Sequence, residues 1–295
     1  MTRLGSIFTS RRPISSSAKT PPSGLIGTWP AWSVGRNMSE RRSDEQRSPD
    51  EFAPVLASAE QPLVVGGQAV NIWAELYAPA VPALTELAPF TSKDADIYGT
   101  RALAETLAHR AGWEVKTVTE RNSVAVAILT KKIDGRDTLV VEVLSEINGL
   151  TADDLTKDEI VTLAAGRTYR IPAPPVLLKA KLYNLASLVG LDRPQDLRQT
   201  RMLMLIVPQY FNELHAEQRE GKITVENLIG AVRYCRAVVH SGVAGNVSRA
   251  HRLDFRQLLP QSLRFASVEI QAAVREFLEG LPDISAVEPP DLFAK

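Results

Sequence analysis

The chain has 295 residues and equal numbers of basic and acidic side chains, 34 of each, so its formal net charge is zero. A neutral chain has no global field that draws it to nucleic acid or to an acidic membrane, and any such contact needs a local patch. The single cysteine, Cys235, excludes an intramolecular disulfide and a cysteine-rich zinc site, and favours a reducing cytoplasm. No apolar run approaches the roughly 20 residues that span a bilayer, so no membrane partner is expected.

The first 49 residues differ in composition from the rest of the chain. They are rich in Ser, Arg and Pro, contain no acidic residue before Glu40 and show no helix or strand period. This composition resembles that of a transit peptide, but Met38 also begins a plausible start of translation. In either case we expect residues 1–49 to be a disordered extension without a role in chemistry.

The first predicted structural unit is a strand that leads through two glycines into a helix. A short amphipathic helix is expected over 50–59, before this unit. The apolar run 62–65 predicts a buried strand that ends at Gly66 and Gly67, and the apolar spacing of 68–77 predicts a helix.

The middle of the chain predicts a series of strands, because its segments are β-branched and alternate in polarity. The expected strands are 94–98, 113–119, 123–131 and 138–144, with a turn at 134–135 and a further strand or hairpin over 160–169. A helix is expected over 100–111, with Thr100 as its cap and Gly112 after its end.

Prolines at 172, 174 and 175 separate this region from a helical one. Helices are expected over 176–189, 195–214, 225–239, 247–259 and 263–281. The fold class is therefore α+β: a mixed β-sheet with flanking helices followed by a C-terminal helical domain. The predicted divisions are an extension (1–49), an α+β domain (50–172), the helical domain (173–282) and a loose tail (283–295).

Three carboxylates carry the candidate chemistry. Asp94 and Asp96 are two residues apart, so on a strand both would project from one face, where a divalent cation would relieve their repulsion. Glu142 is the only charge in the apolar run 139–144, and a buried unpaired carboxylate is costly. We expect it to face a polar site shared with Asp94 and Asp96; the alternatives are a solvated Asp-x-Asp pair and a Glu that points outward from a sheet edge.

Gly66 and Gly67 stand between the predicted strand and the predicted helix. Glycines at this place let backbone N–H groups approach a phosphate, and the helix dipole favours the anion. Taken alone, Gly-Gly is usually only a turn. The order of strand, Gly-Gly, helix, Asp-x-Asp and later acid is more informative than any of its parts.

This order resembles the polymerase-β-like nucleotidyltransferase superfamily, and most closely its AbiEii/AbiGii toxin-like group. The resemblance implies that residues 50–172 form a nucleotidyltransferase-like domain with a mixed β-sheet and flanking helices. The resemblance rests on residues 64–75 and 91–97, on the strand around Glu142 and on the helix that carries Lys181, and it covers roughly 62–205. The chain departs from the family pattern in three places: Glu142 stands where Asp is more usual, Gln195 where a basic residue precedes Asp196, and Gln199 or Thr200 where a later acid is expected.

The resemblance implies a cytoplasmic, magnesium-dependent enzyme that transfers an NMP from an NTP to an acceptor hydroxyl or phosphate. It implies an RNA or tRNA acceptor, or a protein, and an antitoxin protein as partner. The implied roles are two magnesium ions on Asp94, Asp96 and Glu142, with Glu142 also activating the acceptor, and a nucleotide held by Gly66, Gly67, Ser92 and Lys181. For Lys181, the alternative is a solvated helix residue that lies over apolar surface.

Two other functions remain open from the sequence. One is a catalytically silent protein of the same fold that binds a nucleotide or a partner, and the other is a small-molecule adenylyltransferase of the antibiotic-modifying kind. Arginines of the C-terminal helices predict either an RNA-facing patch or an ordinary solvated face; they include Arg198, Arg201, Arg252 and Arg256.

Overall fold

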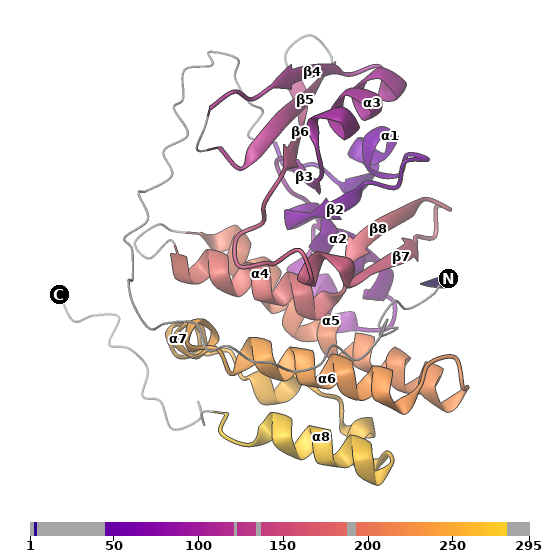
Figure 1. Ribbon diagram of the computed structural model, residues 1–295, viewed down its shortest axis with the longest axis vertical. Helices are drawn as coiled ribbons and strands as arrows, with labels where there is room; N and C mark the ends of the chain where they lie inside the picture. Colours follow the sequence, from indigo (N-terminus) through magenta and orange to yellow (C-terminus); the bar gives the residue numbers. More distant parts are fainter. Residues whose placement is uncertain (1–2, 5–44, 121–122, 134–136, 188–192, 282–295) are drawn as a thin grey trace, which may run out of the picture.

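The computed structural model describes residues 3–4, 45–120, 123–133, 137–187 and 193–281. It is mixed α/β: strands form one mixed sheet, and helices pack against it and continue below it (Figure 1). The strand order is β1-β7-β8-β2-β3-β6-β5-β4. The expected combination of a mixed sheet and helices is therefore confirmed. Within the described ranges, no helix is both long and apolar enough to cross a bilayer.

The strands have short to moderate lengths. Their bounds are β1 Arg3–Leu4, β2 Leu63–Val65, β3 Ala95–Tyr98, β4 Glu114–Thr117, β5 Ala125–Ile133, β6 Asp137–Leu144, β7 Asp158–Thr162 and β8 Thr168–Pro172.

The α-helices are α1 Ala53–Leu56, α2 Gly66–Tyr77, α3 Arg101–Ala111, α4 Pro174–Ser187, α5 Pro194–Arg219, α6 Val225–Val239, α7 Gly242–His251 and α8 Val268–Leu278. Short 3₁₀ helices are η1 Pro49–Phe52, η2 Pro82–Leu87, η3 Asp154–Thr156, η4 Phe255–Leu258 and η5 Gln261–Phe265.

The centre of the sheet sorts apolar and acidic side chains onto opposite faces. Strand β3 pairs with β2 in the antiparallel and with β6 in the parallel direction. In β3, Ala95 and Ile97 are buried in the main core whereas Asp96 is only half-buried, and Val141 and Val143 of β6 flank the half-buried Glu142 in the same manner. The period-two alternation of these strands therefore presents their acids on one face.

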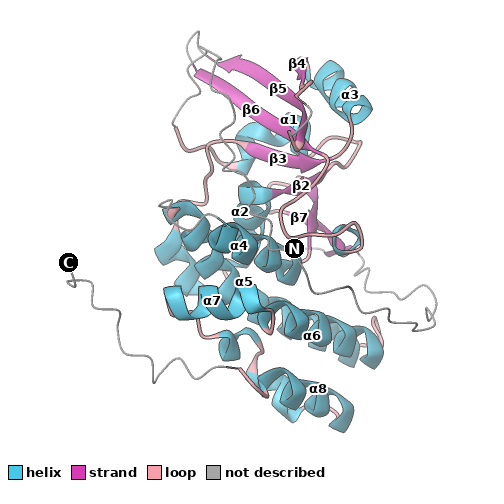
Figure 2. Cartoon of the chain, turned by 60° about the vertical axis from the view of Figure 1, so that its left-hand side comes forward, coloured by secondary structure: helices cyan, strands magenta, loops and turns pink. Residues whose placement is uncertain are grey.

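Helices α4 and α5 lie between the sheet and the lower helices α6 to α8 (Figures 1 and 2). Trp73 of α2 joins these parts: its indole N–H donates to the carbonyl of Pro172 at 3.0 Å, and its ring meets that of Tyr210 in α5 edge to face. Buried side chains from the sheet, α2, α4, α5 and α6 belong to one core. The change from strands to helices near 172 thus occurs within a continuous core.

Some expected elements differ from the observed ones. Residues 45–49 lie in the fold rather than in a loose extension, because Arg47 exchanges two backbone hydrogen bonds with Ser92. The helix expected over 247–259 is interrupted after α7, since Arg252 takes a left-handed conformation with φ 54° and Asp254 caps η4. The expected turn at 134–135, the tail 283–295 and most of the extension lie outside the described residues.

Candidate functional site

The candidate site begins where β2 passes into α2. Gly66 is the first residue of α2 and has a φ of 64°, in the left-handed region that glycine adopts without strain. A Cβ atom at Gly66 would lie only 2.0 Å from Oδ2 of Asp96. The two glycines are thus part of the helix itself rather than a separate turn before it, and the missing side chain lets the Asp96 carboxylate lie directly against the start of α2.

The other two acids adjoin Asp96. Glu142 is its register partner on the neighbouring parallel strand β6. Since β6 lies between β3 and β5, Glu142 is not on a sheet edge, and that alternative is wrong. Asp94 precedes β3 in a bend, so it is adjacent to the strand rather than part of it.

The electrostatics of Asp96 show that these acids act on one another. Burial, Asp94 and Glu142 raise the pKa of Asp96 well above its ordinary value, while Lys181 opposes the shift and Asp196 adds to it. Ionising Asp96 is therefore unfavourable unless positive charge comes close to it. A divalent cation would supply such charge, so the donor set suits magnesium.

The described residues do not contain three His, Cys, Asp or Glu side chains already gathered as a metal-ligand set. Magnesium commonly takes only one or two protein carboxylates and completes its shell with water and substrate phosphates. Asp94 and Asp96 meet that requirement in number and in donor type.

At Gly67, in the same turn of α2, side chains from other segments also lie close to the helix backbone. A Cβ atom there would lie 2.4 Å from Oγ of Ser92 and 2.8 Å from Nε2 of Gln199 in α5. The N-cap residue of α2 is Val65, whose apolar side chain gives no capping hydrogen bond. The start of α2 is therefore surrounded by the hydroxyl of Ser92, the amide of Gln199 and the carboxylate of Asp96.

Lys181 lies in a buried ion network behind the acids. Its side chain is 7% exposed, and its Nζ lies 2.9 Å from Oδ1 of Asp196. Nε of Arg193 lies 2.7 Å from the other oxygen of the same carboxylate. The alternative of a solvated lysine is wrong. Its effect on the pKa of Asp96 places Lys181 in the same electrostatic environment as the acids.

The local sequence patterns did not indicate how α5 contributes to this site. The side chains of Gln195 and Arg198 donate to the carbonyl of Thr91, at 3.0 and 3.2 Å. These contacts hold the segment before Asp94 against the first turns of α5. The family resemblance near Asp196 indicated that this region belongs to the site, but it did not give the contacts of Gln195 and Arg198.

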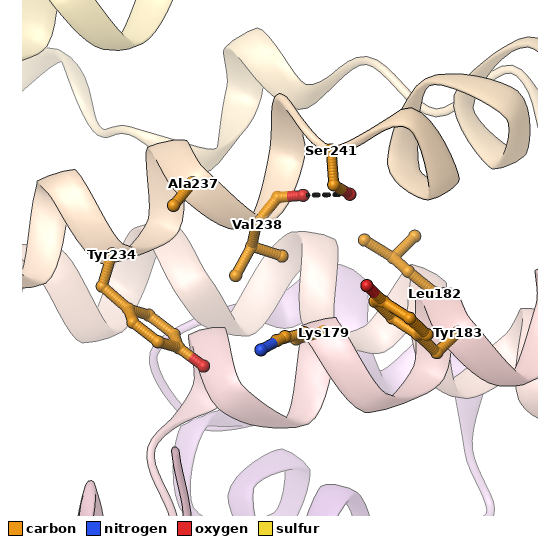
Figure 3. Close-up of a pocket in the computed structure, with 7 residues that line it drawn as sticks. All are labelled: Lys179, Leu182, Tyr183, Tyr234, Ala237, Val238 and Ser241. Atoms are coloured by element: carbon orange, nitrogen blue, oxygen red, sulfur yellow. Dashed lines mark hydrogen bonds between the residues drawn. The ribbon is translucent and has the colours of Figure 1, made fainter. Parts of the chain in front are cut away.

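Two cavities lie apart from the acids. The first, of about 220 Å³, is shown in Figure 3; Lys179 and Tyr183 of α4 face Tyr234 and Val238 of α6 across it. Lys179 and Tyr234 both bond to Asp154, at 2.8 and 2.6 Å.

The second cavity is an open groove of about 830 Å³ between η2, α5 and the segment that follows α7. Its basic lining residues are Arg201, His251, Arg252 and Arg256, and its acidic ones are Glu86 and Asp254. The groove thus contains some of the arginines singled out in the sequence, mixed with acids.

No protein-family model matches the sequence, and no curated protein matches it either.

Proposed function

We propose that this protein is a magnesium-dependent nucleotidyltransferase that moves an NMP from an NTP to an acceptor hydroxyl or phosphate. The observation that carries the proposal is the contact between the Asp96 carboxylate and the start of α2 at Gly66. This contact places a helix N-terminus, which suits a phosphate, directly beside a carboxylate that suits a divalent cation. Transfer of a nucleotide uses both, because the cation neutralises charge on the phosphates.

Each side chain of the site has a role in this proposal. Asp94 and Asp96 would hold magnesium, which would neutralise charge on the phosphates. The N–H groups of Gly66 and Gly67 donate to the phosphate oxygens. Glu142 accepts the proton of the attacking acceptor group as the bond between the α- and β-phosphates breaks and pyrophosphate leaves.

Lys181 and Ser92 complete the proposed nucleotide site. Lys181 supplies positive charge that favours the ionised form of Asp96, and it also attracts the phosphates. Ser92, whose Oγ lies beside the position of a Gly67 side chain, offers a hydroxyl donor to the same phosphates.

The test is nucleotide transfer by the purified full chain. The protein is incubated with magnesium, total RNA and each of the four α-labelled NTPs in turn, and the products are separated by size. We expect label in RNA from the unaltered protein and at least a hundredfold less from the Asp94→Asn variant, because losing a metal ligand removes several kcal/mol of transition-state stabilisation.

A matched control is Asp153→Asn, which alters an exposed aspartate far along the chain. Label in a small acceptor instead of RNA would indicate a small-molecule adenylyltransferase. If no fraction contains label but the protein still binds NTP, the proposed transferase activity is wrong, and the protein is a catalytically silent nucleotide-binding protein.

A further inference from the structure

Unpartnered polar atoms gather where the start of α5 meets residues 91–92. Gln199 is 1% exposed, and among the described residues neither Nε2 nor Oε1 of its amide has a hydrogen-bond partner. The same holds for Nε of Arg198 and for Oγ1 of Thr91. Buried polar groups in folded proteins are nearly always paired, so this cluster leaves donors and acceptors open to a further partner.

This cluster adjoins the start of α2. The Gln199 amide nitrogen lies 2.8 Å from the position of a Cβ atom at Gly67. The 12-residue α2 has no side-chain cap, and the first N–H groups of a helix have no partner within the helix. The amide, the guanidinium group and the helix end therefore supply hydrogen-bond donors to one small region.

The start of α5 brings a positive charge to this region. The Arg198 side chain donates a hydrogen bond to the carbonyl of Thr91, and among the described residues no carboxylate forms an ion pair with it. Burial lowers the pKa of Arg198, so its charged form lacks full compensation. At Gln199 the chain has a neutral amide, where an acid would repel an anion.

We propose that Arg198 and Gln199 form a phosphate-binding wall that holds the phosphate tail of the nucleotide against the N-terminus of α2. The inference rests on the proposed function and adds two residues from another element of the fold. A phosphate has several acceptor oxygens in a tetrahedral arrangement, which match donors arriving from α2 and α5. Two backbone hydrogen bonds with Arg47 hold Ser92 beside this wall.

The test measures binding of tripolyphosphate, a ligand without base or ribose, in the presence of magnesium. Isothermal titration calorimetry compares the unaltered full chain with Gln199→Leu, Arg198→Gln and the control Arg201→Gln, which alters an exposed arginine one turn along α5. We expect affinity about tenfold lower for each of the first two variants and within twofold for the control. We also expect Gln199→Leu to melt at a higher temperature than the unaltered chain without ligand, since it removes an unpaired buried amide.

Each alternative outcome has a distinct meaning. If both variants bind tripolyphosphate as tightly as the unaltered chain, or if the unaltered chain does not bind it, the phosphate-binding wall is wrong. If the variants weaken only the binding of a 5′-phosphorylated RNA hexamer, the phosphate belongs to the acceptor and the assignment to the nucleotide is overturned. If the variants lose tripolyphosphate but no NTP labels any acceptor, the wall stands and the transferase proposal fails.

Discussion

The carboxylate of Asp96 occupies the space into which a side chain at Gly66 would project. The separation of 2.0 Å between a Gly66 Cβ atom and Oδ2 of Asp96 leaves no room for both. The acid at the centre of the sheet therefore requires a glycine at the start of α2, because its carboxylate reaches the helix end only when no side chain is present there.

The first prediction is that Gly66→Ala damages both stability and transfer. Alanine at a φ of 64° is strained, and its Cβ displaces the Asp96 carboxylate. We expect a loss of about 2–5 kcal/mol in the free energy of unfolding, the sum of the left-handed strain and an overpacked contact. Urea denaturation and the RNA-labelling assay measure the two effects.

Gly112→Ala is the matched control for this prediction. Gly112 has a φ of 68°, but a Cβ atom there would meet nothing within 4 Å. It should lose only the strain energy, about 1–2 kcal/mol, and keep full labelling activity. Equal effects of the two substitutions on activity would show that the contact with Asp96 is irrelevant.

The second prediction concerns Glu142, which raises the pKa of Asp96. Glu142→Gln removes a negative charge next to another one, so we expect the metal-free protein to melt a few degrees higher. We also expect addition of magnesium to raise its melting temperature less than that of the unaltered chain. Differential scanning calorimetry with and without magnesium checks both shifts, with the exposed Glu114→Gln as control. A lower melting temperature in the metal-free variant would contradict repulsion between these acids.

Local patterns predicted the parts of the fold that local physics controls. The alternation in β3 and β6 placed Asp96 and Glu142 on the polar side of their strands, and the cap at Thr100 and the left-handed Gly112 bound α3 as expected. These signals span a few residues, because strand period, capping and glycine conformation are short-range properties. The specific nucleotidyltransferase fold remains a prediction.

Long-range packing was beyond such patterns. Gln195 and Arg198 reach Thr91 across sequence separations of 104 and 107 residues, and no period in either segment indicates that contact. The sequence does not decide whether Lys181 binds a phosphate or lies in solvent, because helix spacing alone does not reveal that Asp196 faces it. The candidate acids were thus predictable from the sequence, whereas the α5 residues around them were not.

The third prediction separates the structural role of Lys181 from its proposed role with phosphate. Lys181 and Arg193 both form ion pairs with the buried carboxylate of Asp196. The substitution Lys181→Met removes the first of these pairs and leaves the second. Removing one partner of a buried pair costs about 3 kcal/mol or more, and we expect such a loss of stability in urea denaturation.

The double variant Lys181→Met with Asp196→Leu supplies the control. It removes both members of the buried pair, so most of the lost stability should return. Labelling activity should stay low if Lys181 also contributes to phosphate binding. Recovery of activity together with stability would show that Lys181 serves the fold alone.

The fourth prediction concerns a titrating group away from the acids of the site. Glu75 of α2 is half-buried near the ion pair between Asp50 and Arg167. Burial, with a smaller contribution from Asp50, raises the pKa of Glu75 from 4.5 to about 7, while Arg167 acts in the opposite direction. Between pH 4.5 and about 7, Glu75 therefore keeps its proton in the folded state, whereas the unfolded chain has already released it.

Because the folded-state pKa is the higher one, the stability linked to this proton is present in full below pH 4.5 and is lost as the pH rises through about 7. Glu75→Gln has no such proton to lose, so its stability should gain on that of the unaltered chain between about pH 5 and pH 8. Urea denaturation at intervals across this window measures the difference, and Glu105→Gln, an exposed change on α3, should follow the unaltered chain. A constant difference between Glu75→Gln and the unaltered chain would place the titration of Glu75 outside this window and contradict the effect of burial on its carboxyl group.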